Sequence, residues 1–220
     1  MMAGNLEKFQ SPRKGNGLRA ARALSRGASV HSARPYAYTV CHGERYPAAC
    51  HHCLSRNAKL HRCSQCKFAR FCDVQCQKYA WKDHKRECIC LKSVLPNIPT
   101  DCVRLVGRII FKMLQQPHCD SEELYSLTDL QSHMNDLSEE MNDGLRHLVI
   151  TLQLYLKKEI QDSSMLLSDC NILELFGKNI LPVVLWNIQV LFCKLQTCCN
   201  ILFGQQWLPP WCPPMYSILV

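Results

Sequence analysis

Eight cysteine and histidine residues between positions 50 and 88 form four regularly spaced pairs. They are Cys50 with Cys53, Cys63 with Cys66, Cys72 with Cys76, and His84 with Cys88. Thiolate sulfur and imidazole nitrogen are favoured zinc ligands, and four such ligands complete a tetrahedral structural site. Eight ligands therefore fill two zinc sites and leave no coordination position for a reactive water. We expect the zinc to be structural and not catalytic.

The spacing within each pair allows both members to bind one ion. A gap of two residues in a tight turn brings two thiolates together, and residues four apart lie on one face of a helix. Residues 73–88 contain neither Gly nor Pro, so we predict a helix that carries the last two pairs. The second helical pair is rotated by about 80° from the first, which favours separate ions.

The spacing leaves open how the four pairs combine. Sequential sites would group the first two pairs and the last two pairs. Interleaved sites would group the first pair with the third, giving Cys50, Cys53, Cys72 and Cys76, and the second with the fourth, giving Cys63, Cys66, His84 and Cys88. Isolated cysteines are often simply buried apolar residues. Four regular pairs within 39 residues favour metal binding instead.

The cysteine content also indicates the redox environment. The chain of 220 residues holds 16 cysteines, and no apolar stretch near its first residues resembles a secretory signal. Reduced thiols that bind metal are therefore expected in preference to a disulfide scaffold. We accordingly expect the protein in the cytoplasm and the nucleus.

Charge is unevenly distributed along the chain, whose formal net charge is +8. Residues 50–90 contain nine basic residues and three acidic ones, whereas residues 120–143 contain eight acidic residues and no Lys or Arg. The basic residues of the cysteine-rich region could contact an acidic partner or DNA phosphates, or could simply form a solvated surface. They are Arg56, Lys59, Arg62, Lys67, Arg70, Lys78, Lys82, Lys85 and Arg86.

The segments on either side of the cysteine-rich region differ in expected secondary structure. Residues 29–40 are rich in Val, Tyr and Thr, and a Gly-Asn-Gly turn at residues 15–17 interrupts the preceding chain, so we expect short strands there. Residues 91–100 contain two prolines and no periodicity, which indicates a linker. Helices are expected from Asp101 to Pro117, over residues 121–124 and 128–131, and from Ser138 onward.

The cysteine-rich region resembles a known zinc-binding family. Arg-Cys-Ser-Gln-Cys-Lys at residues 62–67 and Cys-Gln-Lys-Tyr-Ala-Trp-Lys-Asp-His-Lys-Arg-Glu-Cys at residues 76–88 are similar to the MYND finger of the SET and MYND domain (SMYD) protein-lysine methyltransferases. Lys-Gly-Asn-Gly-Leu-Arg-Ala at residues 14–20 resembles the amino-terminal SET motif of that family. The resemblance extends over about residues 5–180 and implies the interleaved arrangement of the two zinc ions.

The resemblance also implies a cofactor and partners. Family members bind S-adenosylmethionine at positions that correspond to Lys14, Gly15, Asn16, Tyr125 and His133. A Gly-rich turn lets backbone approach a ligand closely, although such a turn is also common in an ordinary hairpin. MYND fingers of the family bind proline-rich peptides, and the methyltransferases act on histone or other protein lysines.

Residues 181–220 lack the later motifs of the family: an Asn-His-Ser-Cys segment, the tyrosine of the lysine channel and a Cys-x-Cys-x-x-Cys zinc site. Methyl transfer needs donor and amine held in line, an effect worth about 7–11 kcal/mol. We therefore expect no catalytic residue in this chain and no catalysis by it. Polar residues interrupt the apolar stretch 180–203, so we expect no membrane-spanning segment.

We therefore predict an α+β chain: a partial SET domain of short amino-terminal strands, an inserted two-zinc MYND finger and a helical insertion, with the carboxyl-terminal SET core missing. The expected boundaries are residues 1–49 for the SET strands, 50–88 for the finger, 89–100 for a linker, 101–180 for the helical insertion and 181–220 for an unrelated tail. Two functions remain open: a protein-lysine methyltransferase, and a zinc-dependent protein- or DNA-binding module without enzymatic activity.

Overall fold

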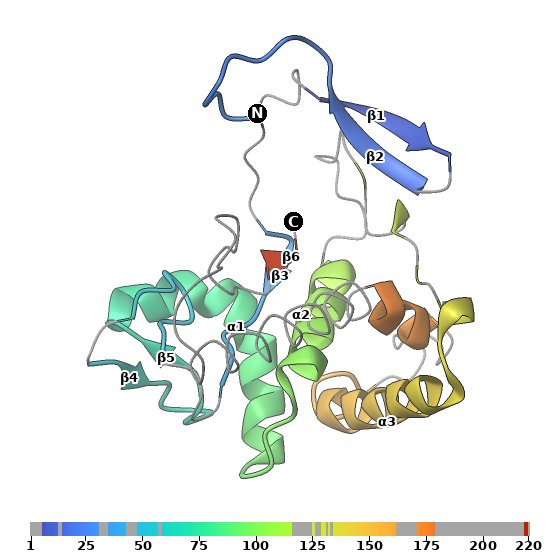
Figure 1. The fold of residues 1–220 in the computed structure, drawn as a ribbon. Coiled ribbons are helices and arrows are strands. Elements are labelled where there is room, and N and C mark those ends of the chain that lie inside the picture. The colour runs from blue at the N-terminus through green and yellow to red at the C-terminus, as the bar shows by residue number, and fades with distance from the viewer. Residues whose placement is uncertain are drawn as a thin grey trace, which may run out of the picture.

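The structure is a computed structural model that describes residues 6–12, 15–30, 35–42, 48–56, 59–115, 125, 129–130, 132, 134–161, 171–178 and 218–219. Within these ranges, helices form most of the regular structure and the strands form three separate two-stranded sheets (Figure 1). This mixture of helices and small sheets agrees with the predicted α+β class. The predicted domain boundaries remain predictions.

Strands β1 (Leu6–Ser11) and β2 (Gly15–Ala20) form an antiparallel hairpin. The expected turn at residues 15–17 is wrong, because those residues begin β2 and the chain reverses before them. Gly15 has a positive φ of 74°, which favours glycine, and Gly17 lies beneath the ring of Phe9. A Cβ on Gly17 would lie 2.8 Å from a Phe9 ring carbon, so this close approach also requires glycine.

The strand expected within residues 29–40 is shorter than predicted. Only Ala37–Tyr38 forms a strand, β3, which pairs antiparallel with β6 (Ile218–Leu219). Residues 21–30 contain no helix or strand, and residues 31–34 lie outside the described residues. In Figure 1, β3 lies between the hairpin and the helices.

Helix α1 (Val74–Val94) carries three of the four ligands predicted to lie on a helix, Cys76, His84 and Cys88, whereas Cys72 lies just before it. It begins at Asp73, whose Oδ1 accepts a hydrogen bond of 2.7 Å from the backbone N–H of Cys76. Within the segment expected as a linker, residues 89–94 are therefore helical, and residues 95–100 contain no helix or strand. The physical reason is burial: Cys90 and Leu91 are fully buried, so the helix continues to pack its inner face against the core.

Helices α2 (Asp101–Gln115) and α3 (Glu139–Leu156) confirm two predicted helices. Ser138 caps α3, and its hydroxyl accepts a hydrogen bond of 3.3 Å from the Met141 N–H. The helix expected over residues 121–124 lies outside the described residues. Of the one expected over residues 128–131, only Asp129 and Leu130 are described, and neither is in an α-helix.

The hydrophobic core lies between α1, α2, α3 and a helical segment at residues 171–178. Gly107 of α2 permits a close approach to α3, because a Cβ there would lie 3.3 Å from a ring carbon of Tyr155. The largest apolar side chains that are almost fully buried here are Leu91, Ile109, Ile110, Leu152, Tyr155, Leu156, Ile172 and Phe176. The finger helix α1 and the helices that follow the finger in the sequence thus share one core.

Most of the predicted tail, residues 181–220, lies outside the described residues. Among the described helices, none combines the length and the apolar character that crossing a membrane requires.

Candidate metal centre

Two turns of the same geometry present the first two ligand pairs. In the first turn, the Leu54 N–H donates to the Cys50 carbonyl at 3.0 Å, and Leu54 has a positive φ of 61°. In the second turn, the Lys67 N–H donates to the Cys63 carbonyl at 2.9 Å, and Lys67 has a φ of 56°. Positive φ is uncommon for residues other than glycine. Each turn holds its two cysteines on the same side of the chain.

A short sheet connects the two turns to the helical ligands. Strands β4 (His61–Arg62) and β5 (Arg70–Phe71) pair antiparallel on either side of the second turn. The first turn is attached to β5 because the His51 N–H donates to the Arg70 carbonyl at 2.8 Å. The Arg70 N–H in return donates to His51 Nδ1 at 3.1 Å. Cys72 follows β5 directly, and helix α1 supplies the other three ligands, Cys76, His84 and Cys88.

The eight side chains come together as two groups in the interleaved arrangement. One group is Cys50, Cys53, Cys72 and Cys76, and the other is Cys63, Cys66, His84 and Cys88. Within each group the potential ligand atoms all lie within 4.8 Å of one another. All four members of the second group are buried, whereas Cys53 of the first group is exposed.

The distances within the groups fit tetrahedral zinc. Sulfur ligands about 2.3 Å from a tetrahedral zinc ion lie about 3.8 Å from each other. The Sγ atoms of Cys53 and Cys72 are 3.6 Å apart, and those of Cys63 and Cys88 are 3.7 Å apart. His84 presents Nε2 to the second group, at 3.7 Å from Cys66 Sγ. Both donor sets therefore suit zinc, which the protein would hold by four cysteines in one site and by three cysteines and His84 in the other.

The electrostatics of the second group favour a thiolate. Hydrogen bonding from Cys88, helped by that from His84, outweighs burial and lowers the pKa of Cys66 below its usual range. A deprotonated sulfur is the form that binds metal. Behind the group, burial alone would raise the pKa of Glu87, but the guanidinium groups of Arg104 and Arg108 outweigh burial and hold the pKa below its usual range.

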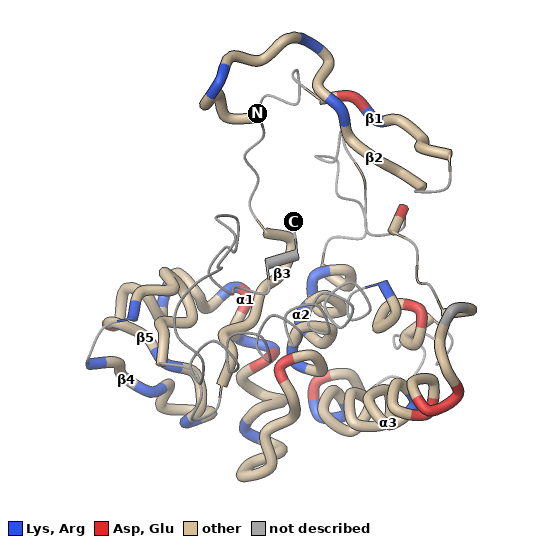
Figure 2. The backbone as a smooth tube through the Cα atoms, viewed as in Figure 1, with Lys and Arg blue, Asp and Glu red and all other residues tan. Residues whose placement is uncertain are grey.

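Seven of the nine predicted basic side chains of this region are exposed, and Figure 2 shows basic positions along β4, β5 and the neighbouring part of α1. Arg70 is half-buried. The expectation that Arg86 belongs to this surface is wrong, because Arg86 turns inward. Its Nε donates to Glu159 at 2.7 Å and its guanidinium lies 4.9 Å from the centre of the Phe111 ring.

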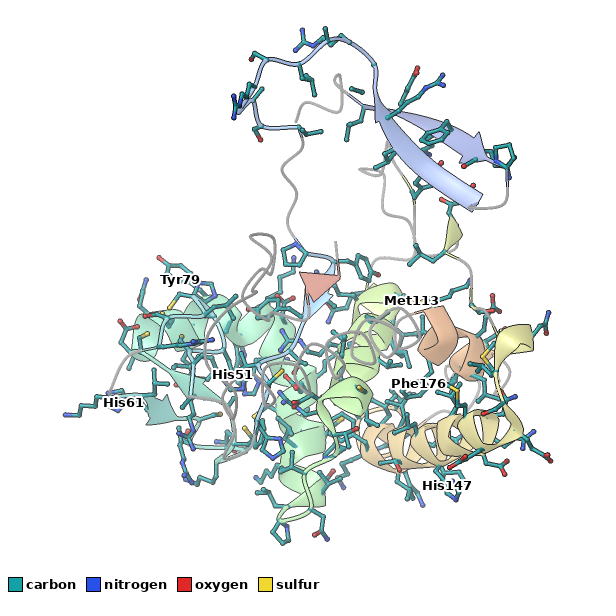
Figure 3. All side chains as sticks on the ribbon, viewed as in Figure 1. His51, His61, Tyr79, Met113, His147 and Phe176 are labelled. Carbon is teal, nitrogen blue, oxygen red and sulfur yellow. The ribbon has the colours of Figure 1, made fainter. Side chains whose placement is uncertain are left out.

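Exposed aromatic side chains accompany the basic ones, a feature that the charge pattern did not indicate. Tyr79 is 63% exposed and Trp81 is 39% exposed, both on α1. The Tyr79 ring centre lies 5.5 Å from that of His52 in the first turn. Figure 3 shows Tyr79 and His61 on the outer side of the finger, away from the helical core. The Gln-Lys-Tyr-Ala-Trp sequence on a helix could have indicated this surface.

Three of the five predicted cofactor residues lie near one another at the hairpin. The Tyr125 hydroxyl donates to the carbonyls of Gly17 at 3.0 Å and Phe9 at 3.1 Å. Asn16 Nδ2 donates to the Asp129 carbonyl at 3.3 Å, and Gly15 precedes it at the start of β2. The other two, Lys14 and His133, lie outside the described residues. These hydrogen bonds thus connect the hairpin to Tyr125 and Asp129.

Comparison with known proteins places these features in a family. Residues 50–88 match the MYND finger family. The chain is 48% identical over 173 residues to human histone-lysine N-methyltransferase SMYD3, in a match that covers 79% of this chain and 40% of the relative.

More distant relatives agree with this match. Mouse histone-lysine N-methyltransferase Smyd1 is 37% identical over 162 residues, which are 73% of this chain and 33% of the relative. Human N-lysine methyltransferase SMYD2 is 35% identical over 159 residues, which are 71% of this chain and 36% of the relative. The chain therefore spans about 40% or less of the length of these relatives. From the finger match and these relatives, the chain belongs to the SET and MYND domain (SMYD) family.

Proposed function

We propose that residues 50–88 are a finger built on two structural zinc ions, and that its exposed surface binds another protein. The observation that carries this proposal is the pair of four-residue donor groups, each with all its ligand atoms within 4.8 Å. Four protein ligands complete each tetrahedron, which is typical of structural and not catalytic zinc. Zinc would thereby hold together a segment that is too short to fold around an apolar core of its own.

The proposed partner is a proline-rich peptide segment of another protein. Such segments dock on exposed aromatic side chains, and Tyr79 and Trp81 are exposed aromatic residues on the finger helix. The surrounding basic residues would favour a partner with acidic residues near its prolines. DNA phosphates are the alternative ligand of the same basic surface.

A binding experiment distinguishes these partners. Proline-rich peptides with and without acidic residues are titrated into the zinc-loaded chain, in parallel with a short DNA duplex. Tyr79→Ala should weaken peptide binding by at least about tenfold, since truncation of a central aromatic contact costs more than about 1.4 kcal/mol. Ile150→Ala, which truncates an apolar side chain 54% exposed on α3, is the control and should bind as the unmodified chain does. Binding of DNA alone would contradict the proposal.

We further propose that the whole protein is a lysine methyltransferase that uses S-adenosylmethionine and acts on histone or other protein lysines, as the names of its relatives suggest. Gly15, Asn16 and Tyr125, which lie together at the hairpin, support a cofactor site there. Lys14 and His133 would complete it. The reducing conditions that free thiols require favour a cytoplasmic and nuclear location.

For the 220 residues on their own we propose no methyl transfer, because residues 181–220 contain none of the later family motifs. The test is transfer of a radiolabelled methyl group from S-adenosylmethionine to histone at micromolar protein, with a full-length relative as positive control. Turnover above background by the 220-residue chain would contradict this part of the proposal and leave the zinc proposal unaffected.

A further inference from the structure

Glu87 lies between the second ligand group and helix α2, and it is fully buried. It precedes the ligand Cys88 on α1 and lies one helical turn after the ligand His84. A buried carboxylate costs folding free energy unless charged or hydrogen-bonding partners surround it. The groups that contact the Glu87 carboxylate therefore indicate its role.

The two oxygens of the Glu87 carboxylate face different groups. Oε1 accepts hydrogen bonds from Arg104 Nε at 3.2 Å and Arg104 Nη2 at 2.9 Å. Oε2 accepts a hydrogen bond from Arg108 Nη1 at 3.0 Å and lies 3.7 Å from His84 Nδ1. One carboxylate thus contacts a predicted zinc ligand and two arginines of α2.

The two ring nitrogens of His84 have separate roles in this arrangement. Nε2 faces the cysteine sulfurs and Nδ1 faces Glu87. A proton on Nδ1 is therefore favoured, which leaves the Nε2 lone pair free for a metal ion. Carboxylates that contact a metal-binding histidine in this way fix the ring orientation and strengthen the ligand.

The arginines that contact Glu87 belong to a row of cationic side chains along α2. Arg104, Arg108 and Lys112 follow one another at intervals of four residues and share one face of the helix. Each lies over an aromatic ring: Arg104 is 4.5 Å from the centre of Phe68, Arg108 is 4.9 Å from Tyr38, and Lys112 is 5.2 Å from Tyr36. This row connects α2 to the second turn of the finger and to β3.

We propose that Glu87 is a positioning residue that couples zinc binding at the Cys63, Cys66, His84 and Cys88 site to the packing of α2 against the finger. The inference rests on the proposed zinc binding. Glu87 aligns His84 through Oε2 and pairs with both Arg104 and Arg108. Asp101 also contacts Arg104, at 3.3 Å, so each buried guanidinium of α2 has an acidic partner. Since the coupling is thermodynamic, zinc binding stabilises the docked α2 as much as docked α2 stabilises bound zinc.

The test compares two substitutions of the same type in the full 220-residue chain. Glu87→Gln removes the carboxylate charge beside His84. Glu159→Gln is the matched control, because Glu159, like Glu87, forms an ion pair with an arginine: its Oε1 lies 2.7 Å from Arg86 Nε. Neither Glu159 nor Arg86 is paired with a predicted zinc ligand. Zinc release to an excess of a chromogenic chelator is followed in time for each chain.

Glu87→Gln should release one of the two zinc equivalents about 10- to 100-fold faster, the usual effect of losing a partner of a metal-binding histidine. Glu159→Gln should release both equivalents at the rate of the unmodified chain. In the cobalt-substituted protein, Glu87→Gln should shift the absorption of the site with three cysteines and one histidine and leave the four-cysteine site unchanged. In the zinc-loaded protein, amides of α2 should exchange faster in Glu87→Gln than in Glu159→Gln.

Equal zinc release and equal α2 exchange in the two variants would overturn the inference. An unmodified chain with fewer than two zinc equivalents would instead overturn the proposed function, so the two failures are distinguishable. If Glu87→Gln yields no folded protein, Arg108→Lys is used instead. This substitution keeps a positive charge near Glu87 Oε2 but loses the guanidinium geometry. Severalfold faster release of the same zinc equivalent is then expected, and an unchanged release rate would overturn the inference.

Discussion

The finger and the amino-terminal hairpin are both small sheet-containing regions, but they are stabilised differently. In the finger, Cys50, Cys63, Cys66 and Phe71 are almost fully buried although β4 and β5 have only two residues each. In the hairpin, the strands have six residues each and none of these is buried. Strand length alone therefore does not decide which region buries its side chains.

The difference lies in what each region is attached to. The finger encloses two donor groups and continues through α1 into the helical core, where Cys90 and Leu91 are fully buried. The hairpin instead contacts Tyr125 and the carbonyl of Asp129, neither of which belongs to α1, α2 or α3. A two-stranded hairpin is only marginally stable by itself. We therefore expect metal binding to stabilise the finger strongly and the hairpin little.

Removal of zinc should change the relative stability of the finger and the hairpin more than any other experiment. Binding of structural zinc to such fingers contributes about 10–16 kcal/mol of apparent free energy, nearly all of it coupled to folding. A strong chelator should therefore abolish protection of residues 63–88 from hydrogen exchange and reduce the helical circular dichroism. Exchange of residues 6–20 should change little.

The zinc-loaded chain provides the control for this experiment. In it, residues 63–88 should be better protected than the first forty residues, because the finger amides lie around buried ligands. Better protection of the first forty residues, or circular dichroism that is insensitive to the chelator, would contradict the comparison.

Substitution of single ligands should distinguish the two donor groups. Cys63→Ser acts in the fully buried group and should lower the free energy of unfolding by more than about 4 kcal/mol, the range of lost metal sites. Cys53→Ser acts in the group with an exposed member and should cost less. Each variant should bind about one zinc equivalent by elemental analysis. Denaturant unfolding of both chains, with Cys102→Ser as a non-ligand control, measures the difference.

The local features of the finger could be predicted from its sequence because they depend on short-range spacing. The four pairs, the helix that carries Cys76 to Cys88 and the Ser138 cap all follow from residue types within one or two turns. The interleaved grouping came from the family resemblance, since spacing alone permits two arrangements. Leu54 and Lys67 gave no sequence signal for their positive φ, because glycine does not occupy either position.

The role of Glu87 could not be predicted, because its partners lie on another helix. The sequence favours an apolar stripe on α2, whereas the structure buries every residue from Val103 to Phe111, including Arg104 and Arg108. Two arginines four residues apart within an apolar helix were the available signal. Their interpretation required knowledge that Glu87 faces them, and such tertiary pairing is not encoded in local periodicity.

Loss of the Tyr125 hydroxyl should affect the hairpin and not the finger. Tyr125→Phe removes the one hydroxyl proton that the carbonyls of Phe9 and Gly17 share, a hydrogen bond worth about 0.5–1.5 kcal/mol. Hydrogen exchange of the hairpin should become up to about tenfold faster, while two zinc equivalents remain bound. Tyr79→Phe is the matched control, since the exposed Tyr79 hydroxyl accepts a hydrogen bond from Gln75, one turn earlier on the same helix, and lies outside the hairpin. Equal hairpin exchange in the two variants would contradict the proposed attachment.

The smallest expected effect concerns the backbone of the second cysteine turn. Lys67 has a φ of 56°, a conformation that costs a residue other than glycine about 1–2 kcal/mol. Lys67→Gly removes that cost but adds about 0.5–1 kcal/mol of backbone entropy lost on folding. The free energy of unfolding should therefore rise by about 0–1.5 kcal/mol, with zinc stoichiometry unchanged. Lys82→Gly, within α1, should instead lower it by about 1 kcal/mol, as glycine does in a helix interior. Equal destabilisation by both substitutions would contradict this prediction and would mean that the strain at Lys67 does not limit the stability of the turn. The metal ligands alone would then hold the turn, and the finger would depend on zinc even more than its contrast with the hairpin implies.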